Sequence, residues 1–289
     1  MDIVLQLVLM GFLALAVAIV GNIAGFGGGI FLVPSLILLF HVEGSIAVAS
    51  VLISMIIPVM IGSFGAWRRN EVDFKIGLVF GIPSAIGALL GALSLAQIPD
   101  LVIVVFISLV ALIFGIRMIV ISTRKEERKE GEEEEISKGM RIWNKINSLK
   151  PIVHIRRNGR IIDISLPVAL VIGLALGMLA GLFGVSGGWI QVPIFIIFFG
   201  LDPLLASGTS LFIIVIKASA GAITYVASGT IAIDWWIVLV LTVGMSIGVI
   251  IGNWLKGKIN GKYISLIVGI VLLFIAIFTV VSSVLHWGT

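Results

Sequence analysis

The chain has 289 residues, of which 60 % are hydrophobic and only 12 % are charged. A water-soluble globule, in which about a quarter of the residues are charged, needs more polar surface than this. The charges are also clustered, because residues 122–163 hold 11 of the 19 Lys and Arg and 8 of the 15 Asp and Glu. These numbers predict an all-α polytopic membrane protein. The absence of cysteine excludes disulfides, iron–sulfur clusters and cysteine nucleophiles.

Ten apolar segments follow one another along the chain. Eight are long enough to cross a bilayer, which takes about 20 helical residues: 3–22, 46–66, 75–95, 101–121, 164–182, 205–226, 235–254 and 263–284. The other two, 29–40 and 188–200, are too short to cross as helices, and each directly follows a glycine-rich break. Short, broken segments at matching places in two halves of a chain indicate the binding site of a transporter.

The two halves of the chain are copies of each other. With an offset of 159 residues, positions 25–62 show 11 identities in 38 positions, including Gly25 with Gly184 and Pro34 with Pro193. An offset of 161 pairs Asp73 with Asp234. We therefore expect a first transmembrane repeat over 1–121, a charged linker over 122–163 and a second repeat over 164–289.

Loop charges predict that the repeats are inverted. The loop at 67–75 is basic and its counterpart at 227–234 is not, whereas 256–262 is basic and its counterpart at 95–100 is not. By the positive-inside rule, equivalent loops then lie on opposite sides of the membrane, the linker is cytoplasmic and both termini are external. Each repeat would hold three full spans and a pair made of a span and a short segment. Whether that pair is a shallow broken hairpin or includes a full crossing stays open.

The paired breaks are the candidate substrate site. Glycine permits backbone N–H groups to point at a ligand, and a helix that begins after the glycines directs its positive dipole end into the membrane. Close helix packing is the alternative role for these glycines. The glycines assigned to substrate binding are Gly27, Gly28, Gly29, Gly187 and Gly188.

Polar residues near the breaks complete the candidate site. Lys217 is a charged residue deep in a span, where ionisable groups are costly and usually functional, and Pro58 takes its place in the first repeat. It could neutralise an anion or take part in proton coupling. Hydrogen-bond donors for an oxyanion are expected from Ser50, Ser186, Gln191, Thr209 and Ser210, although each could instead join helices. No catalytic, metal-binding or cofactor-binding motif is present, so an enzyme is not expected.

The repeated pattern G-x-x-G-G-x-x-x-V-P, which begins at Gly25 and Gly184, resembles the TauE/SafE (TSUP) family of sulfite and organosulfonate transporters. The segments 206–211, 221–225 and 229–234 share this resemblance, whereas 47–51 and 67–70 depart from it. The resemblance implies transport, with export as the expected direction, of sulfur-containing anions such as sulfite, thiosulfate or sulfonates.

The leading interpretation is a secondary transporter in the cell membrane that works by alternating access around the paired breaks. An anion channel and a proton-coupled anion importer are the alternatives. The expected partners are a small sulfur oxyanion or organosulfonate, the lipid bilayer and protons as a candidate coupling ion, with a homodimer left open. Nucleic acid is not expected, because the basic residues lie in loops between apolar spans.

Overall fold

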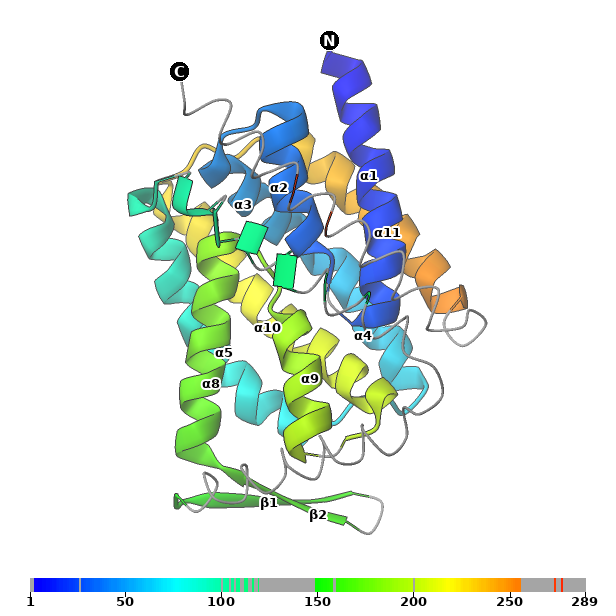
Figure 1. The fold of residues 1–289 in the computed structure, drawn as a ribbon, viewed down its shortest axis with the longest axis vertical. Coiled ribbons are helices and arrows are strands. Elements are labelled where there is room, and N and C mark those ends of the chain that lie inside the picture. The colour runs from blue at the N-terminus through cyan, green and yellow to red at the C-terminus, as the bar shows by residue number, and fades with distance from the viewer. Residues whose placement is uncertain are drawn as a thin grey trace.

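The computed structural model describes residues 3–25, 27–99, 149–157, 160–199 and 201–255, with scattered residues in 101–119 and 273–277. The first half contains α1 (Ile3–Ala24), α2 (Gly29–Phe40), α3 (Gly44–Ser54), α4 (Ile56–Arg68), α5 (Phe74–Ser94) and the 3₁₀ turn η1 (Leu95–Gln97). The second half contains strands β1 (Ile152–Arg157) and β2 (Arg160–Ser165), followed by α8 (Leu166–Phe183), α9 (Gly188–Phe199), α10 (Pro203–Ser228) and α11 (Trp235–Leu255) (Figure 1).

Six helical stretches of the described chain are long and apolar enough to cross a bilayer: Ile3–Ile23, Gly44–Arg68, Phe74–Gln97, Leu166–Phe183, Pro203–Ser228 and Trp235–Leu255. They confirm six of the eight predicted long spans, and the other two, 101–121 and 263–284, lie largely outside the described residues. Large apolar side chains stay exposed on these helices, for example Phe12 (67 %), Ile223 (66 %) and Trp236 (69 %). Such outward-facing apolar surface suits contact with lipid chains.

The two short helices occupy equivalent places in the two halves. Helices α2 and α9 each have 12 residues, and their bounds differ by 159. Both start at a glycine break near the middle of the molecule, and Figure 1 shows α2 running toward the upper end and α9 toward the lower end. The two predicted short segments are therefore confirmed as helices.

Two helix pairs that connect the halves pack at glycine-lined contacts. Helix α5 packs along α8 and α1 packs along α11. A Cβ added at Gly87 or Gly91 would overlap backbone atoms of α8, and one added at Gly248 would overlap the backbone of α1. These glycines allow close backbone approach, as in other packed membrane helices.

A one-residue interruption at Met55 separates α3 from α4, whereas the equivalent helix α10 is continuous. Pro58 has no N–H, so it cannot donate to the carbonyl of Ser54 four residues earlier. The Thr242 hydroxyl of α11 reaches this carbonyl at 3.3 Å, although its shorter bond goes to Val238 O at 2.7 Å. The regular helix is interrupted at Met55, three residues before this proline.

The all-α prediction omitted a β-hairpin. Strands β1 and β2 pair antiparallel, with Val153 opposite Ile164 and His154 opposite Asp163. The residues between the strands are Asn158 and Gly159, a pair typical of two-residue hairpin connections. The hairpin lies in the segment that we assigned to the linker and the start of the second repeat. The Asn158-Gly159 pair indicated a hairpin, but the prediction was based on the high charge of this segment, which is typical of a linker.

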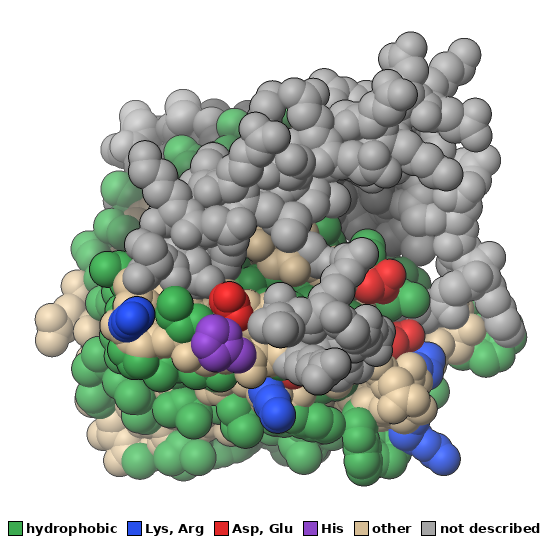
Figure 2. Space-filling view, turned by 90° about the horizontal axis from the view of Figure 1, so that it is seen from below, with side chains coloured by type: hydrophobic (Ala, Val, Ile, Leu, Met, Phe, Trp, Pro, Cys, Tyr) green, Lys and Arg blue, Asp and Glu red, His purple; other side chains and the backbone are tan. Residues whose placement is uncertain are grey.

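The hairpin β1–β2, the start of α5 and the segment around Leu201 that leads into α10 lie together at the lower end of the molecule in Figure 1. The N–H of Asp73 donates to Thr209 Oγ1 at 2.9 Å, which joins the start of α5 to α10. Ile155 of the hairpin shares a buried apolar cluster with Ile76 of α5 and with Leu201. Figure 2, which views this end, shows basic, acidic and histidine side chains among hydrophobic ones. The hairpin and the start of α5 therefore lie at the same end of the molecule.

Candidate functional site

The two glycine breaks lie against each other in the interior. Gly29 at the start of α2 faces the carbonyl group of Gly184, and Gly188 at the start of α9 faces the carbonyl group of Gly25. Gly28 and Gly187, which immediately precede the two helices, have φ angles of +84° and +65°. The positive ends of both short helices therefore begin side by side, although each is close to a carbonyl oxygen of the other break.

Lys217 is fully buried in α10 and its ammonium group lies at the second break. A Cβ added at Gly187 would be 3.0 Å from Lys217 Nζ, so the absence of a side chain at this position makes room for the ammonium group. Lys217 Nζ donates to Gln191 Oε1 of α9 at 3.3 Å. Among the described residues, no carboxylate forms an ion pair with Lys217.

Gln191 and Ser210 add further hydrogen-bonding groups beside this ammonium. An ammonium only donates, so the atom of Gln191 that faces Lys217 is the amide oxygen and the amide nitrogen points elsewhere. Gln191 Nε2 and Ser210 Oγ are buried and have no hydrogen-bond partner in the described part of the chain. Ser210 Oγ lies 3.1 Å from the position of a Cβ at Gly188. The second break thus combines one positive charge with two unused polar groups.

The other polar residues predicted for the site, Ser50, Ser186 and Thr209, differ in what they contact. Ser186 is buried and touches the first break, since its Oγ lies 3.0 Å from the position of a Cβ at Gly27. Ser50 of α3 is buried, and its hydroxyl has no partner among the described residues. Thr209 Oγ1 accepts the Asp73 N–H, so this oxygen takes part in a helix–helix contact. The structure brings Lys217, Gln191, Ser210 and the glycines together, and it gives Thr209 a packing contact.

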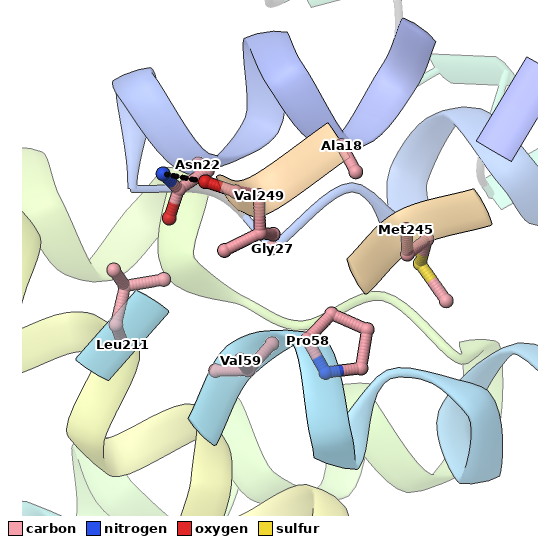
Figure 3. A pocket seen from close by; sticks show the side chains of 8 residues that line it. All are labelled: Ala18, Asn22, Gly27, Pro58, Val59, Leu211, Met245 and Val249. Carbon is pink, nitrogen blue, oxygen red and sulfur yellow. Dashed lines mark hydrogen bonds between the residues drawn. The ribbon is translucent and has the colours of Figure 1, made fainter. Parts of the chain in front are cut away.

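The sequence analysis missed a pocket beside the first break (Figure 3). It is lined by Ala18, Asn22, Gly27, Pro58, Val59, Leu211, Met245 and Val249. Pro58, which takes the place of Lys217 in the first repeat, is one of its walls, and none of the lining residues is charged. Asn22 is 2 % exposed, and a polar residue three positions before Gly25 in an apolar span was the signal that could have identified it.

Metal ligation finds no support in this part of the molecule. Within the described residues, no group of three or more His, Cys, Asp or Glu side chains is close enough to hold a metal ion. The candidate site instead consists of one ammonium, amide and hydroxyl groups, and backbone at two helix starts. Such a set suits an anion, which accepts hydrogen bonds from each of these donors.

Comparison with known proteins gives consistent results. The family model described as "Sulfite exporter TauE/SafE" matches residues 10–279. The probable membrane transporter protein YunE of Bacillus subtilis (strain 168) is 29 % identical over 252 residues, which cover 84 % of this chain and 86 % of that protein. The probable membrane transporter protein YdhB of the same organism is 26 % identical over 242 residues, 81 % of this chain and 85 % of that protein. No solved structure gives a significant match.

Proposed function

The chain belongs to the TauE/SafE sulfite exporter family, and from this premise we propose that it exports small sulfur-containing anions, such as sulfite, thiosulfate or sulfonates, across the cell membrane. It is a multi-pass membrane protein of a transporter family. The substrate anion binds at the paired glycine breaks, where Lys217 and the unused donor of Gln191 meet the start of α9.

The buried ammonium of Lys217 is the observation that carries this proposal. A charge inside a membrane protein is costly unless an opposite charge or a set of hydrogen bonds compensates it. The described residues give Lys217 one neutral partner, Gln191, at 3.3 Å. A bound anion supplies the negative charge that Lys217 lacks. The attraction between the anion and the Lys217 ammonium then holds the anion in the site.

The mechanism that we propose is alternating access between two inverted repeats. Its support is the equivalence of the two halves: α1 packs on α11 as α8 packs on α5, and α2 and α9 leave the breaks toward opposite ends (Figure 1). Asp73 and Asp234 also cap the equivalent helices α5 and α11. If one repeat rocks against the other about the breaks, the same site is exposed first to one side of the membrane and then to the other.

Single-cysteine labelling tests the proposed topology. The chain has no cysteine of its own, so Ser137→Cys and Ser283→Cys each introduce one thiol. Both positions lie outside the described residues. In sealed cells, an impermeant thiol reagent added from outside is expected to label Ser283→Cys, and to label Ser137→Cys only after the membrane is permeabilised. Labelling of Ser137→Cys in intact cells would overturn the orientation.

A flux assay in proteoliposomes tests the transport itself. The purified protein is reconstituted, and efflux of sulfite, thiosulfate and a short sulfonate is compared with efflux of chloride and acetate, with and without a pH gradient. We expect protein-dependent flux of at least one sulfur anion and little flux of chloride and acetate. Flux that does not saturate with concentration would favour a channel. Absence of flux for every sulfur anion would refute the proposal.

A further inference from the structure

The extended segment that leads into α5 is docked on the lower half of α10. A Cβ added at Gly208 would overlap the carbonyl oxygen of Glu71, so the absence of a side chain there lets the backbone of the segment approach α10. The next residue of α10, Thr209, accepts the Asp73 N–H at 2.9 Å. Residues 70–73, which we call the lower segment, are therefore held on α10 by a close backbone contact and by a hydrogen bond.

The start of α5 covers the lysine site from the lower end of the molecule. Thr209 precedes Lys217 by eight residues in α10, which is about 12 Å along the helix axis. Helix α9 runs from the second break to the lower end (Figure 1), and Phe80 of α5 packs on its Phe195 and Phe199 with ring centroids 5.4 and 5.7 Å apart. An anion that reaches the buried Lys217 from this end therefore needs α5 to move aside.

The equivalent segment of the second repeat is more exposed. At an offset of 161 residues, Val72 has Ile233 as its counterpart. Val72 is 4 % exposed, whereas Ile233 is half-buried. The same offset pairs Asp73, which is also 4 % exposed, with Asp234, which is exposed. We call residues 231–234 the upper segment, because Figure 1 shows α11 starting at the upper end. Its last two residues are less buried than their counterparts in the lower segment.

The hydrogen bond that holds the lower segment has no equivalent at the upper one. Ser50 of α3 is the counterpart of Thr209 at an offset of 159, and its hydroxyl is buried without a partner in the described part of the chain. Asp234 instead caps its own helix through its carboxylate. Ala49 takes the place of Gly208, so a methyl group limits how closely a backbone can approach α3. The two ends have equivalent parts, but the lower end is closed more tightly.

We propose that the lower segment is the gate of the site at the lower end, and that this gate is shut in the structure. When α5 moves away from α10, the upper segment docks on α3 and the Asp234 N–H donates to the Ser50 hydroxyl. Equivalent segments of inverted repeats are expected to exchange their contacts in this way. Ser50 then acts in gating and does not bind the anion directly. This inference rests on the proposed function and adds to it the contacts that open and close.

Thiol labelling of the purified full-length protein in lipid nanodiscs tests the exchange, because the chain has no cysteine of its own. Val72→Cys reports on the lower segment and Ile233→Cys on the upper one. Each variant is labelled with a soluble maleimide in the absence of substrate. We expect Ile233→Cys to react at least about tenfold faster, because a buried thiol reacts only when its segment opens.

Adding Gly208→Ala to each reporter opens the lower segment, because the new methyl group overlaps the Glu71 carbonyl oxygen. Labelling of Val72→Cys is expected to rise about tenfold, the effect of a moderate overpacking. Labelling of Ile233→Cys is expected to fall, and this change at the distant end would not follow from a local loss of packing. Thr209→Val, which removes the acceptor and keeps the volume, is expected to cause smaller changes in the same directions.

Gly91→Ala is the control for a packing defect elsewhere on α5, since its methyl group would overlap the carbonyl oxygen of Met178 in α8. It is expected to keep the ratio of the two labelling rates. Adding Ser50→Ala to the Gly208→Ala protein is expected to restore part of the labelling of Ile233→Cys, because the upper segment loses its acceptor.

Faster or unchanged labelling of Ile233→Cys in both Gly208→Ala and Thr209→Val would overturn the gate, even if sulfur anions are transported. The labelling needs no anion, so it is independent of the flux assay. If labelling shows the exchange but no sulfur anion is transported, the gate stands and the proposed substrate fails.

Discussion

Lys217→Met is expected to reduce sulfur-anion affinity by about a thousandfold. An ammonium about 4 Å from an anion contributes about 4 kcal/mol at an effective dielectric constant of about 20, and this energy corresponds to three orders of magnitude in the dissociation constant. Methionine keeps the length and the apolar stem of lysine, so the change removes the charge and little volume. Binding of a sulfonate to purified protein, together with flux in proteoliposomes, measures the effect.

Lys75→Met is the matched control for this substitution. Lys75 is exposed near the start of α5, so its replacement removes one positive charge outside the candidate site. Affinity is expected to stay within about twofold of the parent, because an exposed charge is well screened by water and salt. Loss of binding in Lys217→Met without loss of thermal stability would identify a direct role. Equal binding in Lys217→Met and the parent would contradict it.

Lys217→Arg separates two roles of the same charge. A guanidinium stays protonated in proteins, so this variant can neutralise an anion but cannot release a proton during a transport cycle. If Lys217 acts only as a counter-charge, the arginine variant binds and transports. If proton release is part of the cycle, the arginine variant binds the anion but transports it slowly. Flux measured with and without a pH gradient distinguishes these two results.

Gly187→Val is expected to abolish transport while the protein still inserts in the membrane. At a φ angle of +65° a residue with a side chain is strained by about 1–2 kcal/mol, and the new Cβ would lie 3.0 Å from Lys217 Nζ. The ammonium must then move from the break. Gly28→Val is expected to act in the same way at the first break, where its φ is +84° and the new Cβ would lie 3.2 Å from Val17 Cγ1.

Gly229→Val provides the control for backbone strain alone. Gly229 caps the end of α10 with a φ of +60°, and no atom lies within 4 Å of the position of a Cβ there. This variant carries a similar conformational cost without entering the site, so we expect transport close to that of the parent and a modest loss of thermal stability. If Gly187→Val and Gly229→Val transport equally well, the glycine break is a packing element.

Much of the architecture follows from local sequence. The six long apolar runs in the described part of the chain form span-length helices, because only a helix satisfies its backbone within one segment in lipid. The breaks before Gly29 and Gly188 follow from glycines that adopt positive φ. Lys217 could be selected because a charge in an apolar span is unusual whatever its neighbours are. The hairpin β1–β2 also had a local signal, Asn158-Gly159, that a reading of charge alone overlooked.

Contacts between distant segments were decided only by the tertiary structure. Sequence could not show that Gly25 faces Gly188, that Gln191 orients toward Lys217, or that Asn22 leaves its oxygen unused. The Asn22 contact depends on how α1 packs on α11, the Gln191 contact on how α9 packs on α10, and the Gly25 contact on how the two breaks meet. Hydropathy determines that a helix is buried in a membrane, but packing against its neighbours determines which of its polar atoms find partners and which remain for a ligand.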